Sequence, residues 1–114
     1  MTTASRPPET DVARVRRYCQ PRVPPQARDQ VRLETEVRGS AITIIERRAP
    51  WREDLGPEWS RLKVARLRYD HDSWTLHWAA RNGRWRPYPD LDPSPRLDDL
   101  LAEIDRDPAG AFWG

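Results

Sequence analysis

The sequence predicts an α+β fold: an antiparallel sheet of about five strands, arranged as a β-meander and packed in two layers with an N-terminal and a C-terminal helix. Three observations lead to this prediction. Residues 31–38 alternate strictly between apolar and polar side chains, which is typical of a half-buried strand. Turn signals such as Gly39-Ser40 and Asn82-Gly83 separate strand-like segments and indicate hairpins. Apolar residues recur at helical spacing near both ends of the chain.

The two helices are predicted from their caps and their apolar spacing. Thr10 is a suitable N-cap for a first helix that stops at Pro21, and its inward face is expected to hold Val12, Val15 and Cys19. A second helix is expected to start at Ser94, with an apolar stripe made of Leu97, Leu100, Leu101 and Ile104. The apolar residues Phe112 and Trp113 are expected to dock back onto the domain.

Length and composition bound the organisation of the chain. A chain of 114 residues can close one core but not two, so residues 9–114 are expected to form a single domain after a disordered leader over residues 1–8. The sequence has neither a stretch of about eighteen apolar residues nor a secretory signal core, so we expect a cytoplasmic protein with no membrane attachment. The single cysteine, Cys19, excludes an internal disulfide and agrees with a reducing compartment.

The first hairpin contains one residue that does not fit a simple two-faced sheet. A two-residue turn after Arg38 pairs Val37 with Ile42 on the buried face. The same register places Ile45 on the opposite, polar face. An apolar residue in that position indicates either a helix that covers this face or a β-bulge that shifts the register.

The segment from residue 67 to residue 88 holds three of the six tryptophans and reads as the end of the meander. If the Asn-Gly turn has two residues, Ala80 lies opposite Trp85. Because side chains alternate along a strand, one face is then the core, with Ala65, Leu67, Tyr69, Trp74, Leu76, Trp78 and Trp85. The other face is basic and polar and carries Arg66, Arg68, Thr75, His77, Arg84, Arg86 and Tyr88.

This basic face is the one feature of the sequence that suggests a partner. The candidate binding residues are Arg66, Arg68, His77, Arg84, Arg86 and Tyr88. Arginines two residues apart on neighbouring strands can follow phosphates while aromatic rings contact sugars or bases. The leading hypothesis is therefore a non-enzymatic binding module whose anionic partner is nucleic acid or an acidic protein. The alternative interpretation is a solvated sheet face, because antiparallel sheets commonly expose one side to water.

Charge is distributed unevenly along the chain. Residues 1–89 carry 18 basic and 11 acidic side chains, whereas residues 90–114 carry 2 basic and 7 acidic ones. The acidic second helix of one chain could therefore cover the basic face of another, which makes a self-associating or protein-interaction module, such as a homodimer, the alternative function. Nearly all basic residues are arginines, which suit bidentate contacts to phosphate or carboxylate.

The sequence contains no catalytic signature, cofactor motif or metal-ligand spacing. Glu34 and Glu36 alternate with arginines on one strand face, so cross-strand charge pairing explains them better than acid–base chemistry. His71 and His77 lack partners at metal-ligand spacing, and Cys19 lacks an activating neighbour. We therefore expect no enzyme activity, no cofactor and no metal. A third hypothesis is an enzyme with a cleft between the loop at residues 51–59 and the sheet, using Glu34, Glu36 or Glu46. It would need a pocket that holds a strongly perturbed carboxylate.

Several sequence motifs occur together in a fixed order. They are YCQPRVPPQARDQVRLE, IIERRAPWR, LRYD, WTLHWAARNGRWRPY and the ending DRDPAGAFWG. Together they resemble the DUF-3024 family of small uncharacterised bacterial proteins, and the likeness covers nearly all of the chain after the leader. The resemblance implies a free-standing cytoplasmic bacterial protein, and it brings no agreed activity, cofactor or site residue with it.

Overall fold

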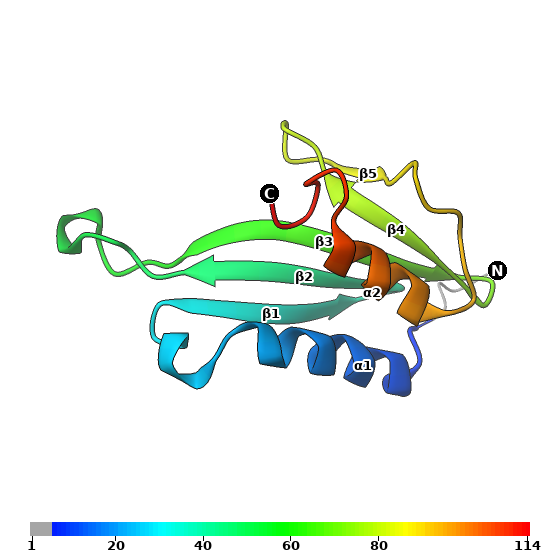
Figure 1. Cartoon of the computed structure of the whole chain (residues 1–114), viewed down its shortest axis with the longest axis horizontal. Coiled ribbons are helices and arrows are strands. Elements are labelled where there is room, and N and C mark those ends of the chain that lie inside the picture. Colours follow the sequence, from blue (N-terminus) through cyan, green and yellow to red (C-terminus); the bar gives the residue numbers. More distant parts are fainter. Residues whose placement is uncertain (1–5) are drawn as a thin grey trace.

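The structure, a computed structural model, describes residues 6–114. Its main elements follow in the order α1 (Glu9–Cys19), β1 (Val31–Arg38), β2 (Ala41–Arg48), β3 (Ser60–Asp70), β4 (Ser73–Ala79), β5 (Trp85–Pro87) and α2 (Leu97–Arg106) (Figure 1). Short 3₁₀ turns lie in the connections, at Gln20–Arg22, Pro25–Ala27 and Glu53–Leu55. Of the predicted leader, residues 1–5 lie outside the described residues, and Pro7 is already buried.

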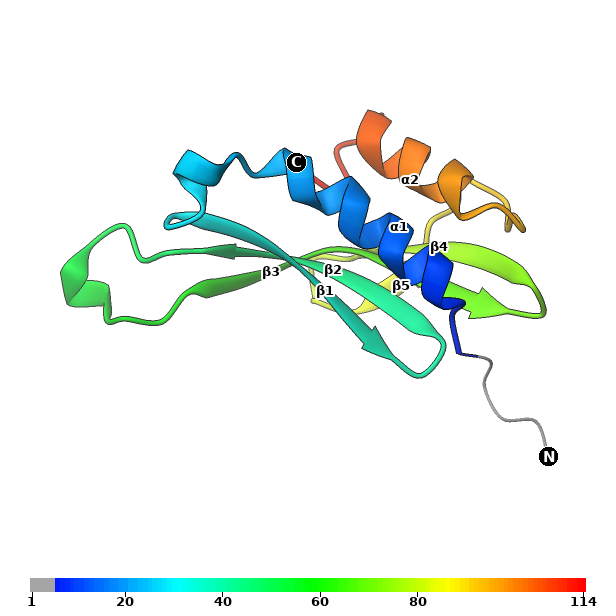
Figure 2. The ribbon, with the colours of Figure 1, turned by 90° about the horizontal axis from the view of Figure 1, so that it is seen from below.

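The five strands form one antiparallel sheet in which each strand pairs with the next one along the chain. Both helices lie on the same side of this sheet, so the molecule has two layers (Figure 2). Neither of the described α-helices lies on the opposite sheet face. The predicted α+β meander with an N-terminal and a C-terminal helix is therefore confirmed.

The hydrophobic core lies between the helix layer and the sheet. From α1 come Val15 and Cys19, and from α2 come Leu97, Leu100, Leu101 and Ile104. The sheet supplies Ile42, Ile44, Val64, Ala65, Leu67, Trp74 and Leu76. Each large apolar side chain buried in this way contributes roughly 1.5–3 kcal/mol, so the contact between the two layers holds the fold together.

Both helices start at positions that differ from the prediction. The N-cap of α1 is Pro8 rather than Thr10, and it suits a helix start because proline needs no hydrogen-bond partner for an N–H. The start of α2 lies after Ser94, because this residue forms an isolated β-bridge with Trp74. The apolar stripe predicted for the second helix is nevertheless the face that α2 buries.

The C-terminal segment is tied to the end of α2. Asp107 caps the helix in a left-handed conformation, with φ +42°. Its carboxylate accepts the backbone N–H groups of Phe112 and Trp113, at 3.1 and 2.8 Å. The indole N–H of Trp113 donates to the carbonyl of Ile104, and the Phe112 ring packs against the Tyr88 ring. The predicted docking of this segment is confirmed.

The first hairpin has the predicted register, with Val37 opposite Ile42. The pairing of β2 with β3 shifts between Ile44 and Ile45, which leaves Val64 as the extra residue of a β-bulge. The bulge lies in β3, however, and the pairing of β1 with β2 is unbroken. Ile45 therefore stays on the helix-free face, as its register predicts.

The turn between β4 and β5 differs from the prediction. The N–H of Ala80 donates to the carbonyl of Arg84, and the N–H of Gly83 donates to the carbonyl of Ala80, so the loop has three residues. Gly83 adopts φ +81°, as the left-handed position of such a loop requires. Trp85 consequently lies opposite Ala79 rather than Ala80. Because side chains alternate along a strand, this one-residue shift turns the faces of β5 over, and the predicted face assignment for β5 is wrong.

Candidate functional site

Charge is concentrated on the helix-free side of the sheet, which we call the basic sheet face. Residues opposite each other in the sheet point to the same side, and successive residues alternate. The strand register therefore assigns to this face Arg32, Glu34, Glu36, Arg38, Ala41, Thr43, Ile45, Arg47, Arg61, Lys63, Arg66, Arg68, Asp70, Ser73, Thr75, His77, Ala79, Trp85 and Pro87. Its cationic side chains outnumber its carboxylates, so the face carries a net positive charge.

Two of the three carboxylates of the basic sheet face, Glu34 and Glu36, are paired across strands, whereas Asp70 at the end of β3 contacts the neighbouring His71. Arg47 forms an ion pair with Glu34. Arg61 contacts both carboxylate oxygens of Glu36. Since Arg61 lies on β3 and Glu36 lies on β1, their contact spans β2 at the level of Ile45. The Ile45 side chain is 0 % exposed, although it lies on the side of the sheet away from both α-helices.

Three cations of β3 lack a carboxylate partner within the described part of the chain. Among the described side chains, Arg66, Arg68 and Lys63 form no ion pair. The Nε atom of Arg66 donates to the Thr43 hydroxyl at 3.1 Å, and its guanidinium carbon lies 4.7 Å from the centre of the Trp85 ring. The Nζ atom of Lys63 lies 5.6 Å from the same ring. Burial lowers the pKa of Arg66, and the neighbouring charge of Arg68 lowers it further, which indicates a positive potential that an anion would relieve.

His77 lies on the basic sheet face directly opposite Arg66. It is 9 % exposed, and its Nδ1 atom has no hydrogen-bond partner among the described residues. Burial lowers the pKa of this imidazole, and the charges of Arg68 and Arg66 lower it further. The neutral form is therefore favoured at pH 7, and His77 adds no positive charge to the face.

The other three predicted binding residues lie elsewhere. Arg84 is exposed in the β4–β5 turn, where its backbone N–H donates to the Asn82 side chain. Arg86 lies opposite Trp78 and therefore points to the helix side of the sheet. Tyr88 is 5 % exposed, and its hydroxyl donates to the Glu103 carboxylate at 2.9 Å on the helix side. The prediction that Arg86 and Tyr88 share the face of Arg66 is wrong, because β5 is turned over.

Trp85 is the site residue that sequence reasoning missed. The prediction placed it in the core, whereas the structure places it beside Arg66 and Lys63. The signal that could have found it is the sequence Arg81-Asn82-Gly83, which also fits a type I turn followed by a left-handed glycine.

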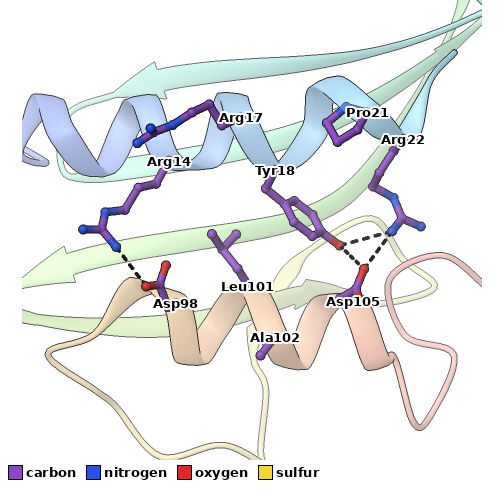
Figure 3. Close-up of a pocket in the computed structure, with 9 residues that line it drawn as sticks. All are labelled: Arg14, Arg17, Tyr18, Pro21, Arg22, Asp98, Leu101, Ala102 and Asp105. Carbon is purple, nitrogen blue, oxygen red and sulfur yellow. Dashed lines mark hydrogen bonds and ion pairs between the residues drawn. The ribbon is translucent and has the colours of Figure 1, made fainter.

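On the helix side, a hollow of about 650 Å³ lies between α1 and α2 (Figure 3). Arg14 binds Asp98 at 2.8 Å on one side of it, and Arg22 binds Asp105 at 3.0 Å on the other. The Tyr18 hydroxyl also donates to Asp105, and burial together with this carboxylate raises the pKa of Tyr18 to about 12. Asp98 and Asp105 of α2 are thus bound by Arg14 of α1 and by Arg22 of the 3₁₀ turn that follows α1, and they lie on the opposite side of the sheet from the basic sheet face.

Over residues 6–114, no three His, Cys, Asp or Glu side chains come together where they could hold a metal ion. None of the helices that the structure describes is long and apolar enough to cross a membrane. Cys19 is 4 % exposed, and burial raises the pKa of its thiol, which opposes reactivity as a nucleophile.

Fold and charge together define the class: a small two-layer α+β protein whose sheet presents one helix-free, arginine-rich face. The chain belongs to the family described as Domain of unknown function (DUF3024), whose match covers residues 4–114. The resemblance inferred from the sequence motifs is therefore confirmed. Neither the curated proteins nor the solved structures include a significant match to the chain.

Proposed function

We propose that the basic sheet face binds nucleic acid and that the protein is a binding module rather than an enzyme. The observation that carries this proposal is a group of three cations on β3, since Lys63, Arg66 and Arg68 form no ion pair with a described side chain. Two of them, Lys63 and Arg66, lie beside the Trp85 ring. Guanidinium groups bind phosphate oxygens in a bidentate geometry. A phosphate backbone laid across β3 would supply the anions that these residues lack.

Trp85 adds a surface that a purely electrostatic site would not need. Bases stack on aromatic rings and on guanidinium planes, and each stacked base contributes roughly 1–3 kcal/mol. Here the guanidinium carbon of Arg66 lies 4.7 Å from the centre of the Trp85 ring. This combination favours single-stranded nucleic acid, whose bases are free to stack, over a duplex.

The alternative proposal is self-association, with α2 of one copy on the basic sheet face of another. The acidic side chains that this contact would use, Asp98 and Asp105, are bound to Arg14 and Arg22 of their own chain. A second copy would have to break these ion pairs, so we favour nucleic acid. Light scattering separates the two proposals. Nucleic-acid binding by a monomer agrees with ours, whereas a mass that rises with concentration and falls in Asp98→Asn/Asp105→Asn supports the alternative.

The proposal is tested by titrating short fluorescein-labelled DNA and RNA, single- and double-stranded, with the full chain at rising salt and following the anisotropy. The logarithm of the affinity should fall linearly with the logarithm of the salt concentration, because released counterions drive the contact. The variant Arg66→Glu/Arg68→Glu should bind roughly 100-fold more weakly, because two charge-assisted contacts are each worth about 1.5 kcal/mol.

The matched control is Arg16→Glu/Arg17→Glu, which makes the same change of charge on exposed residues of α1. It should leave the affinity within about threefold of the wild-type value, because only the overall charge has changed. Equal losses in both variants would mean that binding follows net charge and not the basic sheet face, which would contradict the proposal.

A further inference from the structure

The two edges of the sheet differ in how they are protected. The β5 edge is short and contains Pro87, and both features keep another strand from pairing there. The β1 edge is eight residues long, has no proline, and pairs with β2 along its whole length without a bulge. A long and regular edge of this kind is a template for a further strand.

The open backbone groups of β1 belong to alternate residues. The carbonyl of Gln30 accepts the N–H of Ala49, so the backbone N–H and C=O groups of the even-numbered residues of this strand point towards β2. The backbone N–H and C=O groups that face away from β2 are therefore those of Val31, Leu33, Thr35 and Val37. No backbone group of residues 6–114 outside the sheet pairs with them.

A groove of about 540 Å³ lies between this open edge and α1, and Figure 1 shows the helix running alongside β1. Cys19, Val23 and Leu33 give its lining an apolar part, and Cys19 is almost fully buried. Arg16 and Arg28 line it as well, and both are exposed. An extended segment lying here would find open backbone groups on one side and apolar side chains on the other.

The charge of the groove indicates its occupant. Glu34 is the one carboxylate among the described residues that line it, and this carboxylate is already bound to Arg47. Neither Arg16 nor Arg28 forms an ion pair with a described side chain. We propose that the groove binds an extended acidic segment of a partner protein, which joins the sheet as an extra strand beside β1. Alternate side chains of this segment would enter the apolar part, and its carboxylates would face the arginines.

The proposal is tested by selecting peptides of about twelve residues from a random displayed library against the full chain. The affinity of the selected peptides, made synthetically, is then measured with labelled protein. These peptides should alternate apolar with acidic residues. Thr35→Pro removes an open N–H from an edge strand, where proline is tolerated, and should weaken binding more than about tenfold. The matched control Thr35→Val keeps the backbone groups and should bind like the wild type.

A second variant, Arg16→Glu/Arg28→Glu, keeps the backbone of β1 and should also weaken these peptides more than about tenfold. If Thr35→Pro does not fold, Arg16→Glu/Arg28→Glu provides the test. An unchanged peptide affinity in this variant would overturn the proposal. The proposal also fails if no peptide is enriched, or if the selected peptides bind folded Thr35→Pro as tightly as the wild type. If the free chain forms a dimer and Thr35→Pro abolishes it, the occupant of the groove is a second copy of the chain. This result would overturn the proposal of an acidic partner protein.

Discussion

The two faces of the same sheet are closed against water by different side chains. On the helix side, Ile44 belongs to the apolar core beneath the helices. On the basic sheet face, Ile45 is equally inaccessible, although it lies outside that core and away from both α-helices. The side chains that reach over this strand are charged, with Arg61 bound to Glu36 from one neighbouring strand to the other. Arginine can bury its aliphatic stem in this way while its head group stays in water.

Because the helix side carries the core, the sheet can stay folded while the side chains of the basic sheet face remain available for the proposed contact with nucleic acid. The helix side is fixed by packing, so a change there costs stability. On the basic sheet face, charged side chains cover Ile45, so a change in an outer arginine should cost less stability than a change in the core. Variants of the core and variants of the outer arginines should therefore separate stability from binding.

The largest effect is expected from paired truncations at adjacent positions of β2. Ile44→Ala should lower the free energy of unfolding by about 3–4 kcal/mol, and Ile45→Ala by about 2 kcal/mol, because a cavity beneath flexible arginine stems can partly collapse. Denaturant unfolding of both variants measures this. A loss below about 0.5 kcal/mol for Ile45→Ala would mean that the basic sheet face is not closed over this residue.

A smaller effect is expected from the tyrosine that the sequence placed on the wrong face. Tyr88→Phe removes the hydrogen bond to the buried Glu103 and should cost about 1–2 kcal/mol. The matched control is Tyr69→Phe, which removes the exposed bond to Asp72 and should cost less than about 0.5 kcal/mol. Thermal unfolding compares the two. Equal losses would argue against a buried position for Tyr88.

The pH dependence of stability should report His77. Burial lowers its pKa in the folded protein, whereas the unfolded chain takes up the proton near pH 6.5. The unfolded state therefore binds more protons, and the contribution of His77 to stability should fall as the pH drops from about 7 towards 5.5. Denaturant unfolding over this range should show a flatter profile for His77→Gln than for the wild type. An unchanged profile would mean that His77 titrates normally.

The smallest effect is expected at the turn between β3 and β4, which lies away from both faces. His71 and Asp72 both have positive φ there, at +50° and +58°, as a two-residue hairpin turn requires. Asparagine tolerates this conformation better than histidine, so His71→Asn should raise the free energy of unfolding by about 0.5 kcal/mol. A loss of stability on denaturant unfolding would show that the imidazole itself stabilises the turn.

Local patterns in the sequence were sufficient to predict most of the fold. The alternation over β1 and the turn after Arg38 set the register of the first hairpin, and the apolar stripe of α2 identified its buried face. These signals succeed because a buried face and a tight turn must both agree with the same register.

The same reasoning failed at Gly83, and the error lay in the candidate site. An Asn-Gly pair fits both a two-residue and a three-residue turn, and the two differ by one residue of register. Because of this one-residue difference in register, Trp85 lies on the basic sheet face, whereas Arg86 and Tyr88 lie on the helix side. Arg66, Arg68 and His77 were placed correctly because the turn before β4 has the predicted two residues. The bulge at Val64 lacks any comparable signal in the sequence.

The central claim, that the basic sheet face binds nucleic acid, is tested most directly by a ¹⁵N correlation NMR titration of the full chain with a short single-stranded oligonucleotide. We expect the largest shift changes at the indole N–H of Trp85 and at the backbone amides of Arg66 and Arg68, with little change in α1. Shift changes confined to Arg16 and Arg17 of α1, or no change at low salt, would contradict the account.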